Sequence, residues 1–264
     1  MTEAAVLTSV DDRGVARVIL NRPEVNNAYN GEMIDALVQA LETLAVNDEV
    51  RVVVIQGEGR HFQAGADLAW IDRVREQNQD ENVRVSRITA MALVALNQYP
   101  KPTLALVHGG CFGGGIGLIA SCDIVLAERS ARFAISEARW GLIASIILPQ
   151  LNAAMGLRQV RRYALSCEQF DATRAQEMGL VHELCEPGQL DHCAAEIIDH
   201  LLKSAPEAIG LTKQYALRVA GLESGSADIE SLIQSHALKR RSNESLEGLA
   251  SFREKRNPNW YPST

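Results

Sequence analysis

Strand and helix patterns alternate along the first half of the chain, and this alternation restricts the possible folds more than any other feature. Val15–Leu20 and Val52–Ile55 are short apolar runs rich in β-branched residues, and Gly57 stops the second. Between them, behind a candidate cap at Asn30, apolar residues recur at helical steps of three and four: Met33, Ile34, Leu37, Leu41 and Leu44. Strands that alternate with helices predict an α/β protein with crossover connections.

The pattern changes in the last third of the chain. Up to there the alternation continues, with a helix pattern at 85–96 and apolar strands at 103–107 and 124–127. From Leu190 onward only helical patterns follow, at 190–201, 206–219, 229–238 and 243–255. We therefore expect an α/β body over residues 1–199 and a helical C-terminal region over residues 200–264.

Composition excludes several classes of protein. A chain of 264 residues, 47% of them hydrophobic, buries enough surface to need neither disulfides nor a metal. Its net charge of -7 argues against nucleic acid as a ligand, and its longest apolar run, 142–151, is too short to span a membrane. The acidic first residues are unlike a signal peptide, and the five cysteines form no C-x-x-C pair. We expect a cytoplasmic protein with reduced cysteines, no metal, no nucleic-acid partner and no membrane partner.

Two glycine-rich segments are the candidate ligand sites. One, His108–Gly117, follows the buried strand at 103–107, and the other, Gly59–Leu68, follows the strand at 52–55. Neither is a phosphate-binding Walker loop, and each is also typical of a tightly packed strand-to-helix turn. In α/β folds, however, ligands bind beyond the carboxyl ends of strands, and two backbone N–H groups there can form an oxyanion hole for a thioester or ester carbonyl. Asp67 is more typical of a helix cap than of a catalyst, and His61 of a loop residue than of a base.

Five motifs together resemble the enoyl-CoA hydratase/isomerase (crotonase) superfamily. They occur in the order and spacing of that family and cover nearly the whole chain. The motifs are Asn21-Arg22-Pro23 with Asn27-Ala28, Phe62-x-Ala64-Gly65-Ala66-Asp67-Leu68, Lys101-Pro102 running into Gly113-Gly114-Gly115, Cys122-Asp123-Ile124, and Phe133-x-x-x-Glu137 with Gly141-Leu142. Each alone is weak, but the set is specific.

The resemblance implies a fold and an assembly. The fold is a spiral of repeated ββα units, which makes residues 1–199 the catalytic core, and the helical region at 200–264 helps trimers form. A homotrimer, or a hexamer built as a dimer of trimers, is expected. The substrate is an acyl-CoA thioester, so that coenzyme A belongs to the substrate and no separate cofactor is needed.

The resemblance also implies roles for individual residues. The backbone N–H groups of Ala66 and Gly114 form the oxyanion hole, and Glu137 is the general acid/base. The segment around Ala66 lines the path of adenine and pantetheine. Its predicted binding residues are Ala64, Ala66, Asp67, Leu68 and Ala69. Lys255 meets the phosphates of coenzyme A, although a basic residue at a helix end also suits the helix dipole.

One position departs from the pattern of the family. Its hydratases commonly carry two glutamates, and the first falls here on Gly117, which leaves Glu137 as the single carboxylate. The usual Pro-Gly after the Gly-Leu-Ile segment is altered to Ala144-Ser145 as well. One base suits a Δ3,Δ2-enoyl-CoA isomerase, which moves a single proton between two carbons.

A finer resemblance favours hydration. The segments 59–70, 112–119, 136–142 and 161–165 look like those of bacterial methylglutaconyl-CoA and isohexenylglutaconyl-CoA hydratases. Their substrates, from leucine or acyclic terpene breakdown, carry a second carboxylate, for which Arg139 or another local cation is a candidate. We predict hydration of the 2,3 double bond of a branched glutaconyl-type enoyl-CoA such as 3-methylglutaconyl-CoA. The alternatives are the isomerase and a family member that binds coenzyme A without catalysis.

Overall fold

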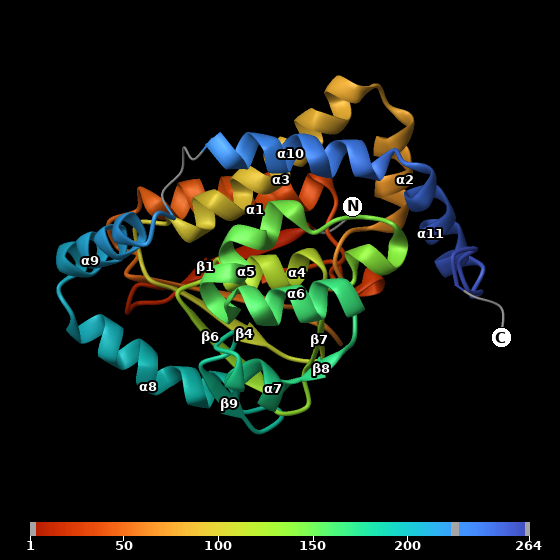
Figure 1. Ribbon diagram of the computed structural model, residues 1–264. Coiled ribbons are helices and arrows are strands. Elements are labelled where there is room, and N and C mark those ends of the chain that lie inside the picture. The colour runs from red at the N-terminus through yellow and green to blue at the C-terminus, as the bar shows by residue number, and fades with distance from the viewer. Residues whose placement is uncertain (1–3, 223–226, 262–264) are drawn as a thin grey trace.

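The computed structural model describes residues 4–222 and 227–261 and contains two β-sheets (Figure 1). The larger sheet has six strands in the order β1 (Val6–Val10), β2 (Val15–Leu20), β3 (Val52–Gly57), β4 (Thr103–Val107), β6 (Ile124–Glu128) and β9 (Glu183–Cys185). All of its pairs are parallel except β1 with β2. The smaller sheet consists of β5 (Gly110–Phe112), β7 (Arg132–Ala134) and β8 (Phe170–Asp171).

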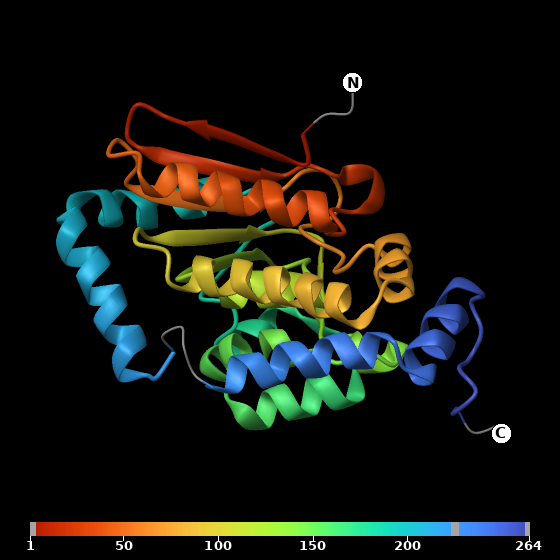
Figure 2. The same ribbon diagram turned by 90° about the horizontal axis from the view of Figure 1, so that it is seen from above.

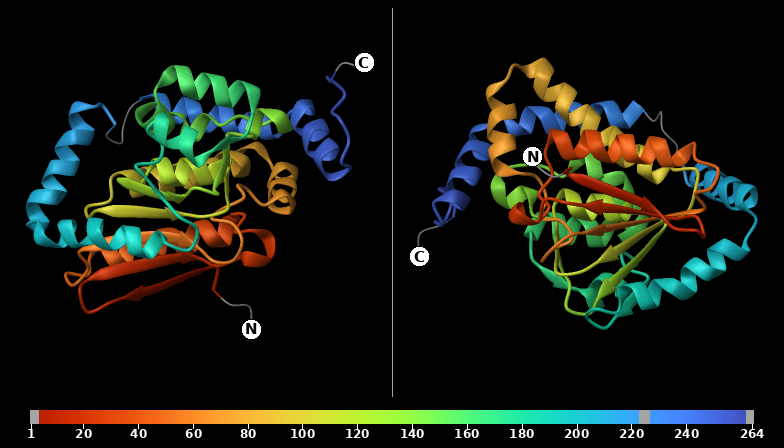
Figure 3. Two further views of the ribbon diagram at one scale, coloured as in Figure 1. Left: turned by 90° about the horizontal axis from the view of Figure 1, so that it is seen from below. Right: turned by 180° about the vertical axis from the view of Figure 1, so that it is seen from behind.

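The central strands are apolar without alternation because both faces of the larger sheet are covered. Val53 and Ile55 of β3 face the main core, which lies under α1 (Gly31–Ala45) and α3 (Gln79–Asn97). Val52 and Val54 face the other way, toward α8 (Leu190–Lys203). Figure 3 shows α8 running across the face of the sheet opposite to α1 and α3.

Successive strand pairs divide between the two sheets. β4 lies in the larger sheet, β5 in the smaller one, and α4 (Gly114–Ala120) follows; β6 and β7 divide in the same way. These repeats turn the chain through successive layers and confirm the predicted ββα spiral (Figure 2). The remaining core helices are α2 (Leu68–Glu76), α5 (Leu148–Met155), α6 (Leu157–Ser166) and α7 (Ala172–Glu177), with 3-10 turns at Pro23–Val25, Glu137–Trp140 and Ser145–Ile147.

The C-terminal region is helical, as expected. Beyond α8, which runs through the boundary placed at residue 200, it contains α9 (Pro206–Val219), α10 (Ala227–Arg240) and α11 (Asn243–Arg253). Helix α9 lies at the edge of the molecule, where Lys213 pairs with Asp123 at 2.8 Å, whereas α10 lies along α3 (Figure 1). α10 also packs on the turn Ser145–Ile147, and α11 packs on the turn Glu137–Trp140. Part of this region therefore closes over the core of its own chain.

The described ranges, 4–222 and 227–261, contain no helix that is both long and apolar enough to cross a membrane.

Candidate active site

A pocket lies where the two glycine segments meet the C-terminal helices. Its empty volume is about 1290 Å³, part of which is open to solvent, and its walls are mainly apolar. Segments from α1, α2, α3, α4 and α10 and from both turns near residues 137 and 147 surround it. Of the residues predicted from sequence, it brings together Ala64, Ala66, Leu68, Gly114 and Glu137.

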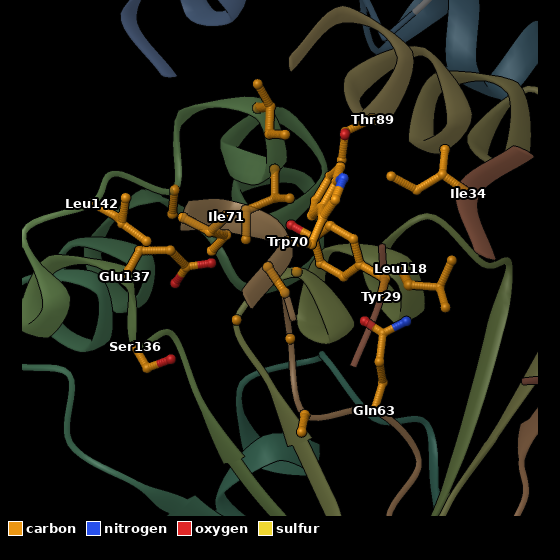
Figure 4. Close-up of a pocket in the computed structure, with 18 of the residues that line it drawn as sticks. Tyr29, Ile34, Gln63, Trp70, Ile71, Thr89, Leu118, Ser136, Glu137 and Leu142 are labelled. Carbon is orange, nitrogen blue, oxygen red and sulfur yellow. The ribbon is translucent and has the colours of Figure 1, made fainter. Parts of the chain in front are cut away.

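Glu137 is the carboxylate among the side chains that line the pocket. It begins the 3-10 turn after β7, and its carboxylate points into the cavity (Figure 4). Oε2 is buried and has no hydrogen-bond partner among the described residues. Burial raises the pKa of Glu137 from 4.5 to about 7, against the lowering effect of nearby backbone N–H groups. A carboxyl group with such a pKa both accepts and returns a proton near neutral pH.

Backbone hydrogen bonds join the two glycine segments. The N–H of Phe112 donates to the carbonyl of Gln63 at 2.9 Å, and the N–H of Gln63 donates to Gly110 at 3.2 Å. His61 supports the junction, because its Nδ1 accepts from the N–H of Gly110 at 2.8 Å. It acts there as a loop residue, as the sequence indicated.

The junction brings two free backbone donors to the pocket. Gly65 has a φ of +88°, and a Cβ there would approach the carbonyl oxygen of Phe112 to 3.2 Å, so that residue 65 must be glycine for the segments to meet. Gly114 is the first residue of α4, where N–H groups have no helical acceptor. Within the described chain, neither the N–H of Ala66 nor that of Gly114 donates to a protein acceptor. Both are available for a ligand oxygen.

Glu137 lies directly beside this pair. A Cβ on Gly113, whose φ is +53°, would come within 3.2 Å of Oε1 of Glu137. Because residue 113 has no side chain, the Glu137 carboxylate can approach the peptide bond between Gly113 and Gly114. The N–H group of this peptide bond is the Gly114 donor. An acid/base group and two hydrogen-bond donors thus surround one region of the pocket.

Three residues predicted for the coenzyme A path do not line the pocket. Oδ1 of Asp67 caps α2 by accepting from the N–H groups of Ala69 and Trp70, and Oδ2 pairs with Arg22 at 3.0 Å. Burial acts to raise the pKa of Asp67, but the hydrogen bonds from Trp70 and Arg22 outweigh it and lower the pKa. Ala69 lies in the first turn of α2, and Lys255 is exposed beyond the end of α11.

An isoleucine occupies the space beside Gly117. A Cβ on Gly117 would lie 2.3 Å from Cγ2 of Ile147 and 3.5 Å from Cδ1 of Leu93. Ile147 belongs to the turn Ser145–Ile147, in the segment where the sequence departs from the Pro-Gly of the family. The wall is therefore apolar where many relatives are expected to carry their first glutamate.

Tyr29 is a site residue that the sequence did not identify. Its ring packs against Trp70 in a T-shaped arrangement with centroids 5.8 Å apart. A Cβ on Gly114 would lie 3.1 Å from the Tyr29 hydroxyl oxygen, so the hydroxyl is near the backbone donor of that residue. Burial, reinforced by Glu137, raises the pKa of Tyr29 to about 12, which keeps the phenol neutral. Its position just before the Asn30 cap carries no sequence signal for this role.

Two further pocket residues, His236 and Arg240, come from α10 and were also not predicted. In residues 4–222 and 227–261, no cluster of three or more His, Cys, Asp or Glu side chains is placed to hold a metal ion. Glu137, with its raised pKa, offers acid/base chemistry beside the pair of backbone donors.

Comparisons with known proteins identify the family of this chain. The enoyl-CoA hydratase/isomerase family matches residues 11–262. A provisionally named enoyl-CoA hydratase of Thermus thermophilus is 35% identical over 96% of this chain and 99% of its own. A mevalonyl-coenzyme A hydratase of Aspergillus fumigatus is 33% identical over 99% and 97% of the two chains.

A solved structure shows the same fold. The crystal structure of an enoyl-CoA hydratase from Mycobacterium avium superposes with a TM-score of 0.86 at 33% identity, covering 98% of this chain and all of the other. The match of the family extends over almost the whole chain, and so does the likeness of the fold. This chain belongs to the enoyl-CoA hydratase/isomerase family.

Proposed function

We propose that this protein hydrates the 2,3 double bond of an enoyl-CoA thioester of the branched glutaconyl type, such as 3-methylglutaconyl-CoA. One observation carries the proposal: the Glu137 carboxylate, whose Oε2 has no partner among the described residues, lies beside the two free backbone donors in a pocket with mainly apolar walls. Leucine or acyclic terpene breakdown in the cytoplasm is the setting that the sequence favours for such a substrate.

In this mechanism the thioester carbonyl oxygen accepts hydrogen bonds from Ala66 and Gly114. Negative charge develops on that oxygen as the substrate becomes an enolate, and donors already in place stabilise it. Removing one such donor typically costs about 10²–10³ in rate. The rest of the coenzyme A extends along Ala64–Ala69, and Lys255 meets its phosphates.

Glu137 moves the proton. Its carboxylate takes a proton from water, the hydroxide adds to C3, and the carboxyl group returns a proton to C2, so that one water is added and the enzyme is regenerated. A single group serves both transfers because a pKa of about 7 makes its two protonation states similar in free energy at neutral pH. The neutral Tyr29 hydroxyl is the second polar group beside the reacting atoms.

Isomerisation is a second candidate, and the apolar wall at Ile147 favours it. With no second carboxylate at Gly117, the proton that Glu137 removes from C2 of a 3-enoyl-CoA returns to C4 and moves the double bond. The family to which the chain belongs includes both reactions by name.

One substrate panel separates the candidates. We expect the wild-type enzyme to hydrate 3-methylglutaconyl-CoA in a steady-state assay and to leave a 3-enoyl-CoA unconverted. Conversion of the 3-enoyl-CoA without hydration of either substrate would establish the isomerase instead. Tight binding of the thioesters without any turnover would leave only the non-catalytic alternative.

A further inference from the structure

A buried cation without a carboxylate partner lies in the wall of the pocket. Arg240, at the end of α10, is only 4% exposed. Its Nη1 donates to the carbonyl and the side-chain oxygen of Asn82 at 3.4 Å, and its Nη2 donates to Ser86 Oγ at 3.1 Å and to His236 Nδ1 at 3.2 Å. All of these partners are neutral, and among the described residues Arg240 forms no ion pair. Burying an unpaired charge is costly, and an anionic ligand group beside Arg240 would offset that cost.

His236 adds a second donor next to this cation. An arginine N–H can only donate, so Nδ1 of His236 accepts from Arg240, and the proton of the neutral ring lies on Nε2. Ser86 Oγ is also 2.9 Å from Nδ1, which fixes the ring on α3. Burial and the neighbouring Arg240 lower the pKa of His236 to about 3, and the ring therefore stays neutral.

Both residues line the pocket that holds Glu137, but on another wall. Glu137 follows β7, whereas His236 and Arg240 belong to α10 where it lies along α3. Tyr29 is within electrostatic reach of both Glu137 and Arg240. The two charged groups form no ion pair with each other, so each remains available to a different part of a ligand.

We propose that Arg240 and His236 bind a carboxylate at the far end of the acyl group, and that the substrate is therefore the monothioester of a dicarboxylic acid. This inference rests on the proposed function, because the pocket must first hold an acyl-CoA. It assigns the substrate carboxylate to α10, a helix in which the sequence showed no site. Arg139, the candidate from sequence, is instead exposed and donates to the carbonyl of Ser166 at 3.3 Å.

The chemistry of the site suits a carboxylate better than an uncharged group. A carboxylate has two oxygens that accept several donors, and charge-assisted hydrogen bonds from a guanidinium are about twice as strong as neutral ones. A substrate carboxylate would supply the negative charge that no described residue places in an ion pair with Arg240. An acyl chain ending in a methyl group would leave that cation buried and unpaired.

The test compares two thioesters of equal length, glutaryl-CoA and pentanoyl-CoA, which differ in whether the chain ends in a carboxylate or a methyl group. We expect the wild-type protein to bind glutaryl-CoA roughly 100-fold more tightly in isothermal titration calorimetry. In Arg240→Met this preference should disappear, while the affinity for pentanoyl-CoA is kept. Arg241→Met, which removes the exposed neighbouring arginine, should keep the preference.

Folding and function are checked separately. Arg240→Met keeps an unbranched stem and removes a buried charge, and circular dichroism verifies its fold; Arg240→Lys, which keeps the charge, should retain part of the preference. Equal wild-type affinity for the two thioesters overturns this inference and leaves the proposed hydration of an enoyl-CoA thioester standing. Failure of the wild-type protein to bind either thioester overturns both.

Discussion

The buried carboxylate of Glu137 is costly to the fold and useful to the reaction. Its Oε2 has no partner among the described residues, and burial disfavours the ionised form more than the nearby backbone N–H groups favour it. We expect Glu137→Gln to lower kcat by about 10²–10⁴ with little change in KM, because the amide keeps the shape of the side chain but transfers no proton. Steady-state kinetics with 3-methylglutaconyl-CoA measure this. Glu196→Gln, on the exposed surface of α8, is the matched control, and unchanged turnover in Glu137→Gln would remove Glu137 from the mechanism.

The same burial predicts the pH dependence of the rate. Only the ionised carboxylate takes a proton from water, and the pKa of Glu137 is raised to about 7. The logarithm of kcat/KM should therefore rise with a slope of about one below pH 7 and level off above it. A pH series from about 5 to 9 measures this. A profile already level at about pH 5 would show an unshifted carboxyl group.

Stability should depend on pH in the opposite sense. The folded protein favours the neutral carboxyl of Glu137, so its contribution to the free energy of unfolding is fully present below pH 4.5 and is lost as the pH rises through about 7. Glu137→Gln has no charge to bury, so above about pH 8 it should be more stable than the wild type by on the order of 3 kcal/mol. Urea unfolding at about pH 4 and pH 8 measures the difference. An advantage of the same size at both values would mean that its cause is not the titration of this group.

Sequence predicts single residues well where a local pattern specifies them. Asn30 caps α1, accepting from Met33 N–H at 2.9 Å, and Asp67 caps α2, each as its residue type and position indicated. Tyr29 and Arg240 carry no such pattern, because they are far apart in the chain and line the same pocket only when α10 packs along α3. The sequence analysis assigned the region of α10 to trimer formation. Arg240 becomes a candidate site residue only when the structure shows that it is buried in the wall of the pocket.

At the scale of elements, the helix pattern at 85–96 correctly marked the apolar part of α3, but the short strands of the smaller sheet were too brief to show a period. β5 and β7 have three residues each and β8 has two. Their pairing is specified by the segments that they join, not by their own sequence. The contact of Ile147 with α4 could not be predicted either, because it depends on how two distant segments pack. Gly117 in the sequence shows that a carboxylate is missing, but not which side chain fills its place.

That contact between α4 and the turn Ser145–Ile147 predicts a coupled pair of substitutions. Gly117→Ala puts a methyl group 2.3 Å from Cγ2 of Ile147 and should destabilise the protein by about 1–3 kcal/mol. Ile147→Ala opens a cavity and should cost about 2–5 kcal/mol alone. In the double variant the new methyl group occupies part of that cavity, so the two costs should sum to more than the measured loss by about 0.5–3 kcal/mol. Urea unfolding of all four proteins completes the cycle, and strictly additive losses would contradict the contact.

At the scale of the whole molecule, the helices of the C-terminal region differ in how much of their surface is buried. α10 and α11 pack on their own chain over many residues, whereas α9 has no buried residue, is joined to the body by the Lys213–Asp123 ion pair and lies at the edge of the molecule (Figure 2). Leu211, Tyr215 and Val219 follow one another at four-residue steps, so they share one face of this helix, and all three are exposed. A helix with such a face is stabilised when it packs against another surface. We expect that surface to belong to a second copy of the chain in the predicted trimer.

The mass in solution decides this. Analytical ultracentrifugation should give three times the chain mass of 28.8 kDa, or six times if two trimers stack. Replacing Leu211 and Tyr215 together by Glu should shift the protein toward monomers, because charged side chains on that face resist burial. Leu165→Glu, which alters an exposed apolar residue of α6, is the control and should leave the mass unchanged. A trimer that persists in the α9 double variant would place the contact elsewhere. Since His236 and Arg240 lie on α10 of the same chain, any monomer that forms should still prefer glutaryl-CoA to pentanoyl-CoA.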